Sequence, residues 1–132
     1  MGIKIKIDVQ KSSVLAEGVA NSKINFFRKS WVADYADEEN FFSLFYSKNF
    51  CPDGFNYTHY CNATFDGLYE KAKSELNDSI RYFYYRQMDK LIIEDAPVVP
   101  LYYDEVVRIV SNKVKDLGIN SMNLLSLKRV KK

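Results

Sequence analysis

Apolar and charged side chains alternate at the start of the chain. Residues 3, 5, 7 and 9 are isoleucine or valine, whereas residues 4, 6 and 8 are lysine or aspartate. A period of two is typical of a half-buried strand. Residues 24–33 are more continuously apolar, which predicts a second and more deeply buried strand.

A short helix is predicted between these two strands. Ser12 or Ser13 can cap it, Gly18 weakens it, and Asn21 and Ser22 end it. A strand, a helix and a strand at this spacing predict a βαβ unit with a parallel pair.

Helical periodicity dominates the middle of the chain. We expect a helix from Asp37 to about Tyr46, an irregular stretch from 47 to 62, and a helix opened by Asn62 or Thr64. A longer helix should begin at a capping Asp78 and stop at Ala96, before Pro97. The two longer helices carry apolar stripes that predict a core: Phe65, Leu68, Tyr69, Ala72 and Leu76, then Ile80, Phe83, Tyr84, Met88, Leu91 and Ile92.

The remaining residues predict strands again. Residues 98–110 are apolar, with Pro100 confining their first part to an edge or a strand start, and 122–130 follow a turn as a weaker strand. No linker divides the chain, so we expect residues 1–132 to form a single α/β domain with a mixed sheet flanked by helices.

Composition and charge exclude some classes of function. The 132 residues, 47% of them hydrophobic, suffice for one core. The formal net charge is +2, and basic and acidic residues are interleaved along the chain, so no nucleic-acid partner is predicted. The basic cluster at 128–132 is expected to be a solvated tail. No apolar run is long enough for a membrane span, and the first residues do not resemble a secretory signal.

Candidate binding residues lie at the end of the second predicted strand, where α/β folds commonly bind ligands. Asp34 can be a turn or capping residue, or it can pair with a ligand ammonium beside Trp31 and Tyr35. Trp31 taken alone indicates a core position. Arg28 can form a structural ion pair or bind a ligand carboxylate through two hydrogen bonds.

Cys51 and Cys61 flank a loop that contains a Pro52–Gly54 turn. Their spacing allows a disulfide. A metal site with His59 and Asp53, or a nucleophile formed by Cys61 and His59, is weakly supported, because no C-x-x-C motif, second histidine or orienting group is present.

Three stretches resemble one known family. They match, in order along the chain, its W-x-A-D-Y-x-D-x-x-N-F/Y, N-Y…F/Y-D-x-L and R…P-x-x-P-L-Y-Y elements. The family is that of the dipeptide- and oligopeptide-binding proteins of bacterial ABC importers, the family 5 extracytoplasmic solute-binding proteins. The matching residues are Trp31, Ala33, Asp34, Tyr35, Asp37, Asn40 and Phe41; Asn56, Tyr57, Tyr60, Phe65, Asp66 and Leu68; and Arg81, Tyr82 and 96–103.

The resemblance implies a place in a larger fold. Family members are several times longer, and only their C-terminal portion is similar. Residues 1–110 would then form part of the larger lobe of a two-lobed type II periplasmic-binding fold, and 111–132 would cross back to the other lobe. We therefore expect a signal upstream and a periplasmic or cell-envelope lipoprotein location for the full-length protein.

The resemblance also implies roles for individual residues. Asp34 matches the residue that holds the peptide amino terminus, and Trp31 would line the cleft beside Tyr35. Backbone groups near Val32 would bind the extended ligand as an added strand. Relatives with a cysteine pair in the matching loop imply a Cys51–Cys61 disulfide.

The expected function is binding of di- or oligopeptides for import through an inner-membrane ABC permease. No covalent chemistry, cofactor or metal is expected, and one cleft wall alone should bind weakly. Alternatives are another solute, such as nickel, haem or a sugar, or a structural module that self-associates. A hydrolase is disfavoured because no G-x-S-x-G motif is present.

Overall fold

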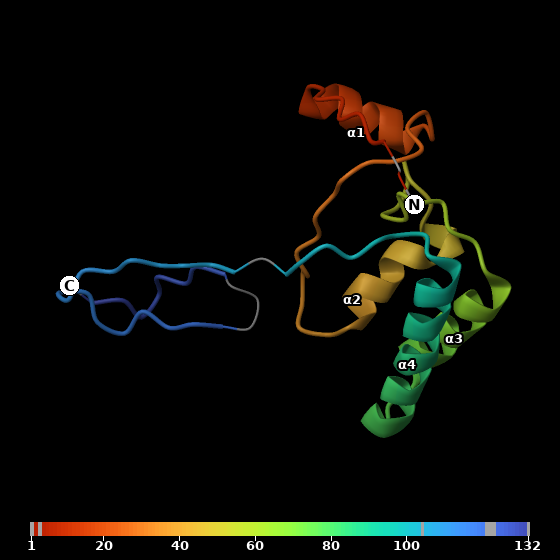
Figure 1. The fold of residues 1–132 in the computed structure, drawn as a ribbon. Coiled ribbons are helices and arrows are strands. Elements are labelled where there is room, and N and C mark those ends of the chain that lie inside the picture. Colours follow the sequence, from red (N-terminus) through yellow and green to blue (C-terminus); the bar gives the residue numbers. More distant parts are fainter. Residues whose placement is uncertain (1, 3, 104, 121–123, 132) are drawn as a thin grey trace.

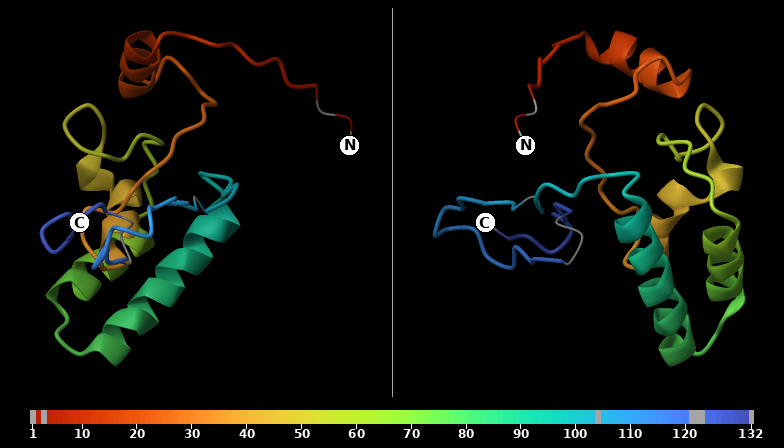
Figure 2. Two further views of the ribbon diagram at one scale, coloured as in Figure 1. Left: turned by 90° about the vertical axis from the view of Figure 1, so that its left-hand side faces the viewer. Right: turned by 45° about the vertical axis from the view of Figure 1, so that its right-hand side comes forward.

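The computed structural model describes residues 2, 4–103, 105–120 and 124–131. α3 and α4 lie side by side with α2 beside them, α1 stands apart near the N-terminus, and the chain after α4 runs away as an extended arm (Figures 1 and 2). The helices are α1 Ser12–Ala20, α2 Glu39–Phe42, α3 Ala63–Ser74 and α4 Asp78–Asp95, with 3₁₀ turns η1 Ser43–Phe45 and η2 Ser47–Asn49.

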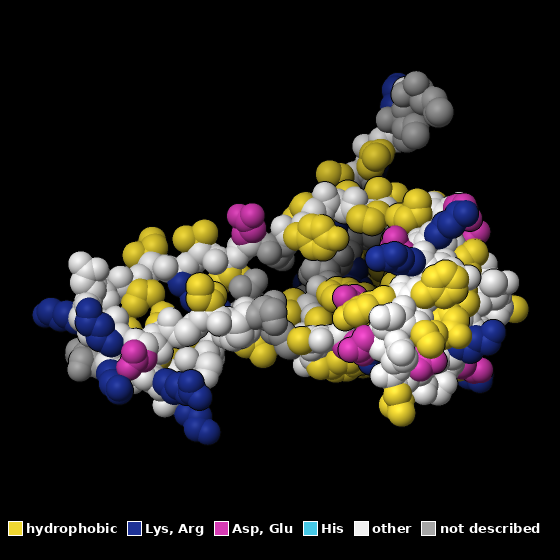
Figure 3. Space-filling model, turned by 90° about the horizontal axis from the view of Figure 1, so that it is seen from below, with side chains coloured by type: hydrophobic (Ala, Val, Ile, Leu, Met, Phe, Trp, Pro, Cys, Tyr) yellow, Lys and Arg dark blue, Asp and Glu magenta, His cyan; other side chains and the backbone are white. Residues whose placement is uncertain are grey.

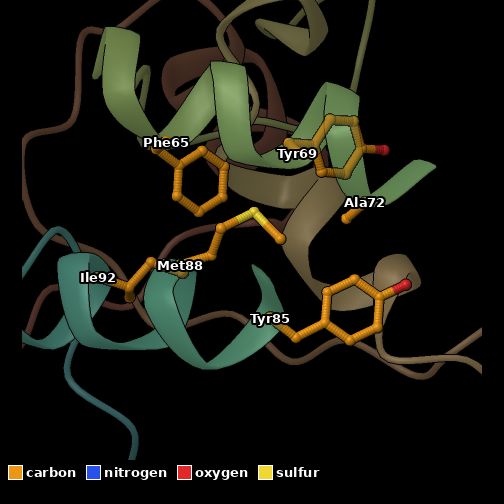
Figure 4. Packing of buried hydrophobic residues seen from close by; sticks show 6 residues of the cluster. All are labelled: Phe65, Tyr69, Ala72, Tyr85, Met88 and Ile92. Carbon is orange, nitrogen blue, oxygen red and sulfur yellow. The ribbon is translucent and has the colours of Figure 1, made fainter. Parts of the chain in front are cut away.

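The core lies between α3 and α4, where the predicted apolar stripes meet (Figure 4). Phe65 and Met88 are completely buried at its centre. The stripes are confirmed at the positions that meet in this core, but Leu76, Ile80 and Phe83 are 96%, 43% and 60% exposed, so their prediction as core was wrong. Leu76 is exposed because α3 ends two residues earlier, and Tyr85, which was not in the predicted stripe, is buried. The buried residues are Phe65, Tyr69 and Ala72 of α3 and Tyr85, Met88 and Ile92 of α4.

Asparagine side chains start both long helices. The Asn62 side chain accepts hydrogen bonds from the backbone N–H groups of Thr64 and Phe65, as expected. Asn77 caps α4 in the same way, so the prediction of Asp78 as the cap was wrong by one residue. Either side chain satisfies N–H groups that lack partners within the helix. The helix stops at Ala96 as predicted, in a left-handed conformation.

The predicted strands are not confirmed. Among the described residues only isolated bridges occur, Phe50 with Asn56 and Lys115 with Lys131, so the expected mixed sheet and βαβ unit are not formed. Parts of three predicted strands, at residues 3, 104 and 122–123, lie outside the described residues. α1 does form in the place expected between the first two segments.

The physical reason is that the extended segments have no neighbouring backbone to pair with. Their apolar side chains face solvent: Val9 is 88% exposed and Ile109 is 98% exposed. Hydrophobic side chains lie along the arm in Figure 3. An apolar strand pattern becomes a strand only when a partner accepts its hydrogen bonds and covers its face.

The arm after residue 110 closes on itself. Lys115 and Lys131 exchange two backbone hydrogen bonds, at 2.9 and 3.1 Å, and the Lys131 ammonium lies 3.1 Å from the Asp116 carboxylate. The basic side chains of this region are exposed and appear at the far end of the arm in Figure 3. That residues 111–132 cross to another lobe stays a prediction. No helix in the described part of the chain combines the length and apolar character that a membrane span needs.

The helix predicted from Asp37 to Tyr46 is divided into α2 and η1. The Asp37 carboxylate explains where α2 begins, because it accepts a hydrogen bond from the Glu39 backbone N–H at 2.9 Å. It also accepts one from the Tyr85 hydroxyl at 2.8 Å and lies 3.3 Å from the Arg81 guanidinium. Asp37 therefore attaches the segment before α2 to α4.

The loop from η2 to α3 is irregular, as expected, and is organised by Asn56, which is completely buried. Its amide nitrogen donates to the carbonyl groups of Tyr46 and Tyr60 at 3.1 and 2.9 Å. Its side-chain oxygen accepts from the Thr58 hydroxyl and the Tyr60 N–H. A buried amide with all its hydrogen bonds made fixes the loop in one conformation.

Met88→Ala should lower the free energy of unfolding by about 2–5 kcal/mol, because it removes apolar contacts and leaves a cavity between α3 and α4. Chemical denaturation followed by circular dichroism measures this. Leu76→Ala is the matched control and should change stability by less than about 0.5 kcal/mol. Equal effects of the two substitutions would contradict the location of the core.

The charge of Asp37 should make stability depend on pH. Burial opposes ionisation, but hydrogen bonds from Glu39 and Tyr85 and the charge of Arg81 outweigh it, so the pKa of Asp37 lies below its usual value. A carboxyl group with a lowered pKa stabilises the fold above its unfolded pKa, about 3.9, and loses that contribution as pH falls through the folded pKa.

We therefore expect Asp37→Asn to lower the free energy of unfolding by about 1 kcal/mol at pH 7. The difference from the wild type should shrink below about pH 4. Urea unfolding between about pH 2 and pH 7 tests this, because a carboxyl group with a lowered pKa titrates at the acid end of that range. Asp89→Asn, at an exposed position of α4, should leave the wild-type profile unchanged. A difference that persists at low pH would show that Asp37 acts without its charge.

Candidate functional site

A cavity of about 280 Å³ lies between the segment around Asp34 and the loop around Gly54. The first segment contributes Trp31, Asp34 and Tyr35. The other lining residues are Asn40 of α2, Ser43 of η1, Asn49 of η2 and, from the loop, Asp53, Gly54 and Phe55. Three of the five predicted ligand residues, Trp31, Asp34 and Tyr35, are therefore brought together at one pocket.

Trp31 and Phe55 form an aromatic wall. Their ring centroids are 5.2 Å apart with an interplanar angle of 56°. The half-buried indole ring donates a hydrogen bond from Nε1 to Asn40 Oδ1 at 2.7 Å. Trp31 is thus fixed in orientation at the pocket rather than placed in the helical core.

Asp34 is exposed at the pocket. Its backbone N–H donates to Asn40 Oδ1 at 3.3 Å, whereas no hydrogen bond or ion pair of its carboxylate is recorded within the described residues. The local capping role falls to Asp37. Asp53 also lines the pocket, and the described lining contains no basic residue. The two carboxylates therefore make the pocket attractive to a cation.

Tyr35 is held by Glu39. The Tyr35 hydroxyl donates to Glu39, which also accepts from the Tyr69 hydroxyl of α3. Burial raises the pKa of Tyr35, and the hydrogen bond and charge of Glu39 raise it further. The same causes raise the pKa of Tyr69. Both phenols remain neutral donors at physiological pH, and the Glu39 carboxylate accepts a hydrogen bond from each of them.

Arg28 and Val32 are not among the residues that line the pocket. The Arg28 guanidinium donates to the Tyr102 hydroxyl and lies 5.7 Å from the centre of the Tyr102 ring. This contact joins the segment before Asp34 to the start of the arm. Val32 is exposed on extended backbone. The ligand-binding roles expected of both residues stay predictions.

Cys51 and Cys61 are free thiols in the structure, with Cys51 buried and Cys61 exposed. The expected disulfide is therefore not confirmed. His59 lies between them in sequence, and its Nε2 is 2.8 Å from the Cys51 carbonyl, which can only accept a hydrogen bond. Its Nδ1 then accepts from Ser22 at 3.0 Å, so both ring nitrogens have structural partners. Within the described residues no group of three or more metal-binding side chains occurs.

The loop residues of the pocket were not foreseen from the sequence. Gly54 lets the loop pass close to the backbone of Asn49, because a Cβ at this position would lie 2.4 Å from the Asn49 carbonyl oxygen. The Pro52–Gly54 turn was visible in the sequence, but a turn does not reveal which residues it approaches. Asn40 belonged to the recognised motif, although no role had been assigned to it.

The known proteins with similar sequences agree with the resemblance that the motifs indicate. No family model matches the chain. It is 27% identical over 97% of its length to "Dipeptide-binding protein DppE" of Bacillus subtilis, covering 23% of that protein. It is 26% identical over 98% of its length to "Probable di/tripeptide-binding protein 5" of Pseudomonas aeruginosa, covering 24%. "Periplasmic murein peptide-binding protein MppA" of Escherichia coli is 24% identical over 92% of the chain, which covers 22% of that relative.

The chain thus spans roughly a quarter of the length of these curated relatives. Several of the matched proteins carry the words dipeptide-, di/tripeptide- or oligopeptide-binding in their names. The resemblance carried by the sequence motifs is confirmed: over most of its length, the chain is homologous to the C-terminal part of dipeptide- and oligopeptide-binding proteins.

Proposed function

We propose that the chain supplies one wall of the ligand site of an extracytoplasmic peptide-binding protein, which delivers di- or oligopeptides to an ABC permease in the inner membrane. The observation that carries this proposal is the position of Asp34: an exposed carboxylate at the edge of an aromatic pocket, in a chain whose relatives are named for binding peptides.

The pocket suits the amino terminus of a peptide. An ammonium group needs a carboxylate partner, and a charge-assisted hydrogen bond of this kind is short and directional. The volume of about 280 Å³ is below the range of roughly 300–1,000 Å³ typical of complete small-molecule sites. The pocket therefore suits one end of a ligand, whose remainder would extend past the wall formed by Trp31 and Phe55.

The extended segment before Asp34 suits the rest of the peptide. Within the described residues, no backbone–backbone hydrogen bond involves residues 28–33, so their N–H and C=O groups can pair with a ligand strand. Pairing through the backbone gives affinity that does not depend on the ligand side chains. Arg28, near the start of this segment, would then be free to exchange Tyr102 for a ligand carboxylate.

The ligand chemistry favours a peptide over the other solutes considered. The described lining offers carboxylates, amides and aromatic rings, a set that matches an ammonium group and an extended amide backbone. Self-association as the function has no support from the described residues. The function is binding without covalent chemistry, since the matched relatives are named as binding proteins.

Location and disulfide formation are linked in this proposal. A periplasmic or cell-envelope lipoprotein meets an oxidising environment, where a pair of cysteines can be oxidised. Cys51 and Cys61 lie at either end of the loop that forms the second side of the pocket. A disulfide between them would tether this loop and with it Asp53 and Phe55.

Asp34→Asn should weaken the binding of an unmodified tripeptide about 10- to 100-fold, the loss expected for a hydrogen bond between charged groups. Isothermal titration of the protein encoded by the complete gene measures it. N-acetylation of the tripeptide should cause a similar loss in the wild type and little further loss in the variant. Asp89→Asn is the charge-matched control and should bind normally.

If Asp34→Asn binds the unmodified tripeptide as tightly as the wild type, Asp34 does not hold the amino terminus. If no peptide of a mixed di- to pentapeptide pool binds the wild type, the homology identifies the scaffold and not the ligand.

The cysteine prediction is tested by intact-mass spectrometry of protein exported to an oxidising compartment. Without reductant, the protein should be lighter by the hydrogens lost on forming one disulfide, and Cys61→Ser should abolish that difference. Two thiols that remain free in the exported protein would exclude the disulfide.

A further inference from the structure

Asn40 is the most buried polar residue at the pocket, with only 3% of its surface exposed. Burial of an amide side chain is costly unless its polar atoms are hydrogen-bonded. Asn40 also lines the cavity, so its bonds decide how the wall around it is arranged.

The side-chain oxygen of Asn40 joins two pocket residues. It accepts the Trp31 indole N–H at 2.7 Å and the Asp34 backbone N–H at 3.3 Å. An amide oxygen has two lone pairs, and these two donors use both. One atom therefore links the indole ring of Trp31 to the backbone of Asp34.

The backbone of Asn40 is fixed by its neighbours in the chain. Its backbone N–H donates to the Asp37 carbonyl at 3.2 Å, and its carbonyl accepts from Ser43 Oγ at 2.8 Å. On the opposite side, Asn49 donates to the Ser43 carbonyl at 2.9 Å, which ties the loop to the same turn.

We propose that Asn40 is a positioning residue of the binding site: through its side-chain oxygen it holds Trp31 and Asp34 in the arrangement that receives the ligand amino terminus. The inference deepens the proposed function and rests on it for the identity of the ligand. The arrangement of Trp31 is independent of that identity and is tested separately.

Trp31 is the only tryptophan of the 132-residue chain, so its fluorescence reports on this contact directly. Asn40→Leu has a similar size but no acceptor, and it should shift the Trp31 emission to longer wavelength and increase quenching by acrylamide. Asn40→Asp keeps the acceptor oxygen and should retain the wild-type emission. Asn112→Leu, at an exposed turn position, is the matched control and should change neither.

Circular dichroism separates a local effect from unfolding. The proposal requires that Asn40→Leu retains its helical signal while Trp31 changes. If Trp31 emission and quenching are the same in Asn40→Leu and the wild type, the proposal is overturned. It is also overturned if Asn40→Asp changes them as much as Asn40→Leu does, because the acceptor oxygen then has no part in holding the indole.

The effect on binding is measured by isothermal titration of an unmodified tripeptide and its N-acetylated form against the protein encoded by the complete gene. Asn40→Leu should weaken the unmodified tripeptide at least about fivefold, the value of one hydrogen bond. Unchanged affinity would overturn the positioning role in binding. If the wild type binds no peptide but Trp31 responds as expected, the proposed function fails while the arrangement by Asn40 stands.

Discussion

The packing of α3 against α4 is the constraint on which the rest of the described chain depends. Phe65 and Met88 meet at its centre without solvent contact, and partly buried aromatic residues from η1 and the following loop cover its edge. No other described part of the chain buries a comparable cluster. The segment that leads into α2 and the loop before α3 are positioned by how they are attached to this pair of helices.

The attachments that lead to the pocket are polar. Asp37 joins the segment before α2 to Tyr85 and Arg81 of α4, and Glu39 joins it to Tyr69 of α3. Asn40 then transmits that position to Trp31 and Asp34. Because hydrogen bonds fix direction as well as distance, a small core can hold a pocket wall that lies outside it.

The sequence predicted what is local and failed where partners are distant. The spacing of Phe65, Tyr69, Met88 and Ile92 predicted the helices and their core, since periodicity along one helix is contained within a few turns. Trp31, Asp34 and Tyr35 were found through a short motif and do share one pocket. The approach of the loop residues was not predictable, because it depends on Asn56 and Gly54 closing the loop on itself.

The predicted strands differ for a related reason. Ile5, Val9 and Val107 have the apolar pattern of strands, but a strand also requires a second backbone for its hydrogen bonds, and none lies beside them in the described residues. The same absence of a backbone partner within the described residues, at 28–33, is what the proposed pairing with an extended ligand would use. The proposed function therefore rests on an unpaired segment that leads to the exposed Asp34 carboxylate.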